Sequence, residues 1–142
     1  MNAPTPPSEP EPVRHPERVV GLFVAVVWAA LTFASFGVLA VLLDRDPVEQ
    51  PVGPYFGIAV ILVTLVIVYL GIVMTVPARL PWLGAITTAA CVALAPMGAA
   101  ALVDLDLMFE QATSPFVLVA ALLALVPPVA CWAWFGRTAV RR

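Results

Sequence analysis

Four long apolar runs without any charged residue dominate the pattern along the chain. They cover residues 19–43, 53–76, 82–103 and 115–136. Each exceeds the roughly 20 residues that a helix needs to cross a hydrocarbon core about 30 Å thick. Because lipid offers no partners for backbone N–H and C=O groups, a run of this length is expected to be helical. The pattern predicts an all-α bundle of four transmembrane helices, with residues 16–142 as the membrane domain. The first run is too long for the apolar part of a signal peptide and no A-x-A site follows it.

The arginines between the runs predict the orientation of the four helices. Six of the seven fall on one side of the four-span arrangement and Arg45 alone falls on the other; the six are Arg14, Arg18, Arg79, Arg137, Arg141 and Arg142. Positive charge is retained in the cytoplasm, so both termini are expected there and the protein is expected in the plasma membrane. Trp82, Trp132 and Trp134 lie near the predicted cytoplasmic ends, where aromatic side chains gather at the interface.

Composition agrees with lipid as the main solvent. Of the 142 residues, 62% are hydrophobic and 11% charged, with a mean hydropathy of +1.01. Soluble domains carry about a quarter charged residues. The net charge of −2 gives no basic face for nucleic acid. Residues 1–15 are rich in proline and contain little to bury, so a disordered cytoplasmic tail is expected.

The chain repeats itself at a shift of about sixty residues. Asp44 and Asp46 correspond to Asp104 and Asp106, and the later matches are Glu49-Gln50 with Glu110-Gln111 and Pro54 with Pro115. The repeating unit is a two-helix hairpin with an acidic outer turn, and two copies of equal orientation are related by an axis along the membrane normal. Convergence is the alternative, because proline is common at helix starts and acids are common in translocated loops.

The acidic turns raise the question of a metal site. The candidate ligands are Asp44, Asp46, Glu49, Asp104, Asp106 and Glu110. Asp-x-Asp opens calcium loops, but neither turn continues with the third oxygen ligand and glycine of an EF-hand. If residues 102–112 are helical, an apolar stripe forms and Leu107 interrupts the polar face. That pattern favours a short helix resting in the outer interface with solvated acids. A weak cation site built from both turns is the alternative.

The predicted spans contain no ionisable side chain beyond their cysteines and tyrosines. Buried charges mark proton relays and ion pathways in membranes, so their absence argues against proton-coupled transport and ion pumps. The single histidine, His15, lies in the tail, and Ser35 has no base beside it. No catalytic residue and no cofactor is therefore predicted, and an enzyme is not expected. Cys91 and Cys131 lie within apolar runs at a spacing that matches no metal or redox motif.

Small and weakly polar residues are expected to pack the helices together. Gly21, Ala25 and Ala29 in the first run have small-xxx-small spacing, and so do Ala85, Ala89 and Ala93 in the third. The hydroxyl groups can bond across helices or back to their own helix; they belong to Thr32, Ser35, Thr64, Tyr69, Thr87 and Thr88. Pro96 and Pro127-Pro128 remove backbone donors, so kinks are expected there. A pore or a lipid-binding cleft is the alternative to a purely packed interior.

A proline-rich tail, four Ala/Val-rich runs and an Asp-x-Asp turn before Gly53-Pro54 complete the pattern. The chain resembles the small uncharacterised four-helix membrane proteins of high-GC Gram-positive bacteria, which implies a four-helix fold but no activity and no site residue. Two functions remain. The first is a non-catalytic scaffold or accessory subunit that packs within the bilayer, against itself or a larger membrane complex. The alternative is a small transport or cation-binding protein that uses the acidic turns.

Overall fold

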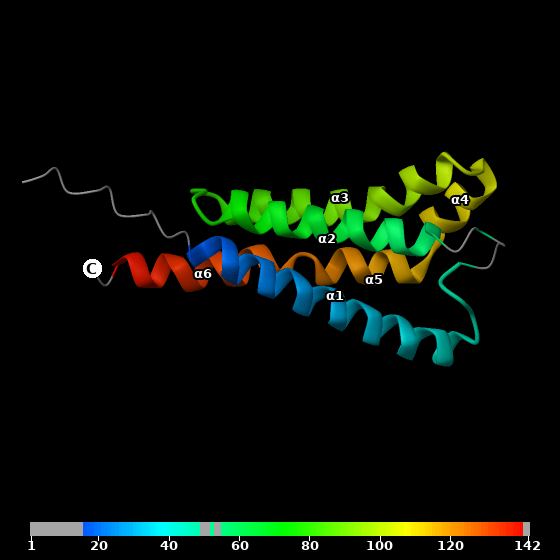
Figure 1. Cartoon of the computed structure of the whole chain (residues 1–142), viewed down its shortest axis with the longest axis horizontal. Helices are drawn as coiled ribbons and strands as arrows, with labels where there is room; N and C mark the ends of the chain where they lie inside the picture. The colour runs from blue at the N-terminus through cyan, green and yellow to red at the C-terminus, as the bar shows by residue number, and fades with distance from the viewer. Residues whose placement is uncertain (1–15, 49–51, 53–54, 141–142) are drawn as a thin grey trace, which may run out of the picture.

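The computed structural model describes residues 16–48, 52 and 55–140, which form six α-helices (Figure 1). In chain order these are α1 (Pro16–Leu43), α2 (Tyr55–Thr75), α3 (Pro81–Ala101), α4 (Leu105–Thr113), α5 (Pro115–Leu123) and α6 (Val126–Val140). The described residues contain no strand, so the all-α prediction is confirmed for them. The predicted tail, residues 1–15, lies outside the described residues.

Four helical segments are long and apolar enough to cross a membrane. They are α1, α2, α3 and the α5–α6 pair taken together, and each lies within a few residues of a predicted run. Most of their apolar side chains face away from the protein. In the most apolar stretch of each span, only 11% of the residues of α1 and 17% of those of α2 are buried, compared with 33% in α5–α6. This exposure suits a multi-pass membrane protein, whose outer helix faces contact lipid chains.

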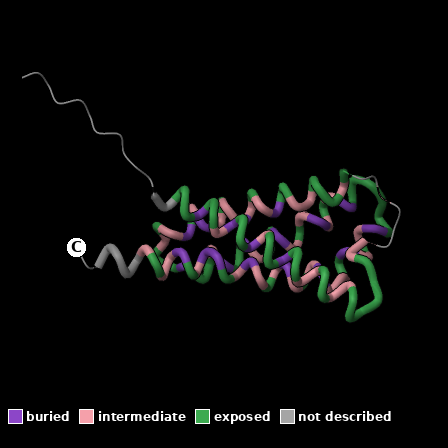
Figure 2. Tube along the Cα trace, turned by 60° about the horizontal axis from the view of Figure 1, so that its bottom comes forward, coloured by how far each residue is buried: buried purple, intermediate pink, exposed green. Residues whose placement is uncertain are grey.

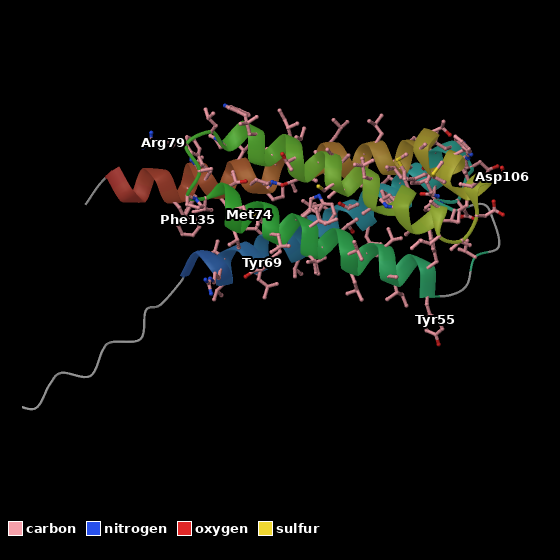
Figure 3. All side chains as sticks on the ribbon, turned by 90° about the horizontal axis from the view of Figure 1, so that it is seen from above. Tyr55, Tyr69, Met74, Arg79, Asp106 and Phe135 are labelled. Atoms are coloured by element: carbon pink, nitrogen blue, oxygen red, sulfur yellow. The ribbon has the colours of Figure 1, made fainter. Side chains whose placement is uncertain are left out.

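Consecutive spans run antiparallel and give the bundle two chemically different ends. The start of α1, the α2–α3 loop and the end of α6 lie together at one end, where Arg79 is found; we call it the arginine end (Figures 1 and 3). The end of α1, the starts of α2 and α5, and α4 lie at the other, with Asp106; we call it the acidic end (Figures 1 and 3). Among the described residues, Arg18 and Arg79 thus lie at the end opposite Asp44, Asp46, Asp104 and Asp106, as the sequence predicted.

The core is a narrow seam of mostly small and medium side chains that runs along the inner faces of the helices (Figure 2). Its buried members are Ala25, Trp28, Val68, Ile72, Val92, Ala120, Ala124 and Cys131. The predicted small-residue faces point into this seam. Gly21 and Ala25 are buried in α1 and Ala85 is buried in α3, while Ala29 is half-buried. These faces are therefore occupied by contacts within the chain.

The closest helix pair is α2 with α3, near the arginine end. Gly71 and Thr75 on α2 face Thr88 and Gly84 on α3. A Cβ added to Gly71 would lie 2.1 Å from the Thr88 hydroxyl oxygen, and one added to Gly84 would lie 2.0 Å from that of Thr75. Each threonine therefore occupies the space that the opposite glycine leaves. The two Gly-x-x-x-Thr motifs are reciprocal because the helices are antiparallel, and they bring the backbones close together.

Several hydroxyl groups in the spans bond back to their own helices. Thr32 donates to the carbonyl of Trp28 at 2.9 Å, and Ser35 donates to that of Leu31 at 2.9 Å. Thr88 donates to the carbonyl of Gly84 at 2.7 Å. The structure thus decides between the two bonding modes that the sequence allowed for these residues. Such bonds satisfy a polar group in lipid without needing a neighbouring helix.

The predicted fourth span is broken into α5 and α6. Pro127 and Pro128, both buried, supply no N–H to the carbonyls of Leu123 and Ala124, so α5 ends before them and α6 begins at Val126 with both prolines in its first turn. Leu125 N–H instead donates to Leu122 at 3.3 Å in a tight turn. The kink expected at this pair is confirmed. At Pro96, by contrast, α3 continues as one helix to Ala101.

Candidate functional site

A cavity of about 220 Å³ lies inside the acidic half of the bundle. It is enclosed by α1, α2, α3 and α5. Pro47 and Val48, which follow α1, and Gln111 of α4 also line it. The larger side chains around it are Trp28, Phe33, Phe36, Phe56, Ile61 and Phe116. The volume exceeds an engineered apolar cavity of about 150 Å³ that stays dry and binds benzene. It is smaller than the roughly 300–1,000 Å³ typical of sites for drug-sized ligands.

Few polar groups line the cavity, and most of them already have partners. Thr32 is bonded to the carbonyl of Trp28, and Thr64 donates to that of Val60 at 2.9 Å. The amide nitrogen of Gln111 donates to the carbonyl of Pro47 at 3.3 Å. The indole nitrogen of Trp28 is buried and has no hydrogen-bond partner among the described residues. The lining is therefore almost entirely hydrocarbon, with its amide at the acidic end.

Aromatic contacts hold α1 at the cavity. The rings of Phe36 on α1 and Phe116 on α5 meet edge to face, with centroids 5.4 Å apart and an interplanar angle of 84°. Beyond this contact α1 diverges from α2, as Figure 1 shows. Val38, Val41 and Leu42 there are between 60% and 83% exposed. At the acidic end, two phenylalanine rings thus fill the space between α1 and α5. At the arginine end, glycines allow α2 and α3 to approach closely.

The cavity opens between α1 and α2. Its floor is buried: Val92 on α3 is 1% exposed and Phe116 on α5 is 2% exposed. Its lining on the other side includes Phe33 on α1, which is 53% exposed, and Gly57 on α2, which is exposed as well. A Cβ at Gly57 would meet nothing within 4 Å. Because both exposed lining residues lie within spans, the opening faces the side of the bundle.

The first acidic turn terminates α1. Asp44 has a positive φ of 49°, the left-handed conformation that usually falls to glycine after a helix. The N–H of Arg45 donates to the carbonyl of Ala40 at 3.2 Å, which is the six-to-one bond of a Schellman motif. Aspartate tolerates this conformation better than most side chains. Asp44 therefore has a structural role in the backbone of the turn, and its side chain is exposed, as is that of Asp46.

The second acidic turn begins a helix instead. Asp104 is the N-cap of α4, and its carboxylate accepts a hydrogen bond from the N–H of Asp106 at 2.9 Å. The predicted short helix is confirmed, with bounds Leu105–Thr113. Its inward face, however, consists of Leu107, which is fully buried, and Gln111, which is 4% exposed. The burial of Leu107 explains why the polar face of this segment contains an apolar residue: its side chain anchors α4 to the bundle.

The two turns meet at the acidic end, through the bond from Gln111 to Pro47. Of the six candidate metal ligands, Glu49 lies outside the described residues. Among residues 16–48, 52 and 55–140, no group of three or more His, Cys, Asp or Glu side chains is placed to hold a metal ion. Asp44, Asp46, Asp104 and Asp106 are exposed and Glu110 is half-buried. The structure thus brings the turns together through an amide rather than through clustered carboxylates.

Trp28 is a lining residue that the sequence analysis did not name, and Gln111 appeared there only as part of the repeat. A signal for each was present. Trp28 is the one tryptophan that falls in the middle of a predicted span rather than near its end. Gln111 is one of two glutamines in the chain, and both occur at matching positions of the repeat.

The arginine end is fixed by another tryptophan. Trp132 on α6 donates its indole N–H to the carbonyl of Ala78 in the α2–α3 loop at 3.1 Å. The cysteines are both free: Cys91 is exposed on α3 and Cys131 is buried on α6.

Comparison of the chain with models of known protein families, with curated proteins and with solved structures finds no match.

Proposed function

We propose that this protein is a non-catalytic scaffold or accessory subunit of the plasma membrane, which packs laterally against itself or against a larger membrane complex. The positive-inside rule supports cytoplasmic placement of the arginine end and of both termini. The correspondence of buried positions supports a duplicated hairpin: Gly21, Ala25, Trp28 and Thr32 in α1 are each followed sixty residues later by a buried residue of α3. Asp44 and Asp104 have this same shift.

One observation carries the proposed role: α1 presents small residues outward. Ala30, Ala34 and Gly37 lie one turn apart on α1, and all three are exposed. A Cβ at Gly37 would meet nothing within 4 Å. Between transmembrane helices, small residues mark the surfaces where another backbone approaches closely. The small faces predicted for packing are buried within the chain, whereas this outward stripe is available to a neighbouring helix.

The test is association in a mild detergent and in nanodiscs. Full-length protein is expected to purify as an oligomer or with a membrane protein partner. Gly37→Leu should abolish that association, because the larger side chain holds the neighbouring backbone away. Gly98→Leu is the matched control, since Gly98 on α3 is also an exposed helical glycine with open space around it. A protein that is purely monomeric and free of protein partners would contradict the proposal, as would equal association of both variants.

A second function, cation binding at the acidic end, is favoured by the contact between the two turns. The bond from Gln111 to Pro47 places two Asp-x-Asp segments at one end of the bundle. The described part of the two turns carries the carboxylates of Asp44, Asp46, Asp104, Asp106 and Glu110, which would attract cations electrostatically. Titration of Ca²⁺ or Mg²⁺ should then raise the melting temperature, and the double variant Asp44→Asn, Asp104→Asn should reduce the shift. No shift in the wild-type protein would exclude this function.

A further inference from the structure

We infer that the cavity between α1 and α2 is a binding site for one acyl chain of a bilayer phospholipid. The inference does not depend on the scaffold role, because none of Ala30, Ala34 and Gly37 lines the cavity. It rests on three features of the cavity: its chemistry, its shape and the position of its opening.

The chemistry of the lining selects hydrocarbon. Ordered water needs two to four polar partners, and the hydroxyls of Thr32 and Thr64 are already bonded to their own helices. Among the described residues no charged side chain lines the cavity, so these residues offer nothing to a cation or a phosphate. The aromatic rings and the aliphatic residues of α2 provide the dispersion contacts that a methylene chain makes.

The shape suits a chain that lies along the bundle. On α1 the lining extends from Trp28 to Phe36, which is roughly 12 Å of helix at 1.5 Å per residue. The other end of the cavity reaches Pro47 and Gln111 at the acidic end. An amide near the end of the spans and hydrocarbon towards their middle match the polarity of a phospholipid, whose esters lie near the interface and whose chains lie deeper. With about 220 Å³, the cavity holds part of a chain rather than a whole lipid.

The position of the opening identifies the source of the chain. Phe33 and Gly57 are exposed lining residues within α1 and α2, so the mouth faces the hydrocarbon of the surrounding bilayer. Towards water, Gln111 on α4 lines the cavity and is bonded to Pro47, and the buried Leu107 anchors α4 to the bundle. A lipid chain therefore enters sideways from the membrane, through the mouth between α1 and α2.

Quenching of Trp28 tests this inference. Trp28 lines the cavity and is 5% exposed, so a lipid chain inside the cavity lies closer to its ring than the lipid around the bundle does. Protein with Trp28 as the only tryptophan (Trp82→Phe, Trp132→Phe, Trp134→Phe) is reconstituted into phosphatidylcholine vesicles with or without bromine on the acyl chains. The inference predicts loss of Trp28 emission in the brominated vesicles. Equal emission in both kinds of vesicle would overturn it.

Two glycines provide a matched pair of variants. Gly57→Phe places a ring at the mouth and should restore Trp28 emission in brominated vesicles. Gly98→Phe adds the same ring to open space on α3, away from the lining, and should leave the quenching unchanged. Equal quenching in both variants would overturn the assignment. If the single-tryptophan protein does not fold, as judged by loss of its helical circular dichroism, a second experiment takes the place of the quenching experiment. Gly57→Phe and Gly98→Phe are then each made in the chain with all four tryptophans, and bound phospholipid is detected by native mass spectrometry. A phospholipid retained by Gly98→Phe but lost by Gly57→Phe supports the site, and any other pattern overturns it.

Discussion

The two ends of the bundle use opposite means of holding helices together. At the arginine end, Gly71 and Gly84 leave space that Thr88 and Thr75 fill, and the α2–α3 loop is tied to Trp132. At the acidic end, the rings of Phe36 and Phe116 span the distance between α1 and α5, and a cavity remains beside them. Close packing requires small residues opposite one another, and the arginine end has them at matching positions on α2 and α3. The difference indicates a stable end and an adaptable end within one short bundle.

The two acidic turns show that similar sequences need not form similar structures. Asp44 ends a helix with a positive φ, whereas Asp104, at the matching position, begins one. The cause lies three residues further on. Pro47 corresponds to Leu107, and proline both lacks an N–H and disfavours helical geometry in the residue before it. With leucine there instead, residues 105–113 form α4, which then covers the acidic end.

The largest effect is expected from removing the anchor of α4. Leu107→Ala should destabilise the protein by about 2–5 kcal/mol, as for other fully buried leucines. Unfolding by sodium dodecyl sulfate, followed by circular dichroism, measures the loss. Leu105→Ala is the control, because Leu105 is on the same helix and is 63% exposed. Equal losses for the two variants would contradict the orientation of α4 described above.

Filling the space at the arginine end should have the next largest effect. Gly71→Ala or Gly84→Ala should each cost about 1–3 kcal/mol, since the new methyl group overlaps a threonine on the facing helix. Gly98→Ala, where a Cβ meets nothing within 4 Å, should be neutral or slightly stabilising in the same unfolding assay. If Gly71→Ala or Gly84→Ala is as stable as Gly98→Ala, α2 and α3 are not in close contact.

The two aspartates should respond differently to alanine and glycine. At position 104, alanine removes the N-cap and should cost about 1 kcal/mol, while glycine, which is tolerated at N-caps, should cost only a few tenths. At position 44, glycine should be more stable than alanine by about 1 kcal/mol, because alanine is strained at positive φ. Equilibrium unfolding of the four single variants compares the sites. Alanine as stable as glycine at position 44 would contradict the Schellman geometry.

The smallest effect concerns the tie between α6 and the α2–α3 loop. Trp132→Phe keeps an aromatic ring but loses the donor to Ala78, so a loss of about 1 kcal/mol is expected. Hydrogen exchange should also become faster in the α2–α3 loop around Ala78. Trp134→Phe is the control, because Trp134 is 70% exposed on the same helix. Unchanged exchange in Trp132→Phe would show that the bond does not hold the loop.

Much of the fold could be predicted because membrane helices depend on local properties. Length and hydropathy gave the four spans, and Pro127-Pro128 gave the break between α5 and α6. The cavity was less accessible to sequence reasoning. It depends on Phe36 meeting Phe116, residues eighty positions apart, and on Gln111 reaching Pro47. Gly71 and Gly84 could have been recognised, because the two Gly-x-x-x-Thr motifs are placed symmetrically about the α2–α3 loop.

The sequence by itself indicated that most of the chain lies in lipid, that its four apolar runs are helical, and that acidic and basic residues lie at opposite ends. These follow from the hydrocarbon thickness and from the cost of unpaired backbone groups in lipid, which act on each run independently. Only the tertiary structure decided which small residues face inward, why Leu107 is apolar, and where a cavity remains. Such features depend on how side chains from separate helices fill common space, and a difference of one methyl group, as at Gly71, changes the result.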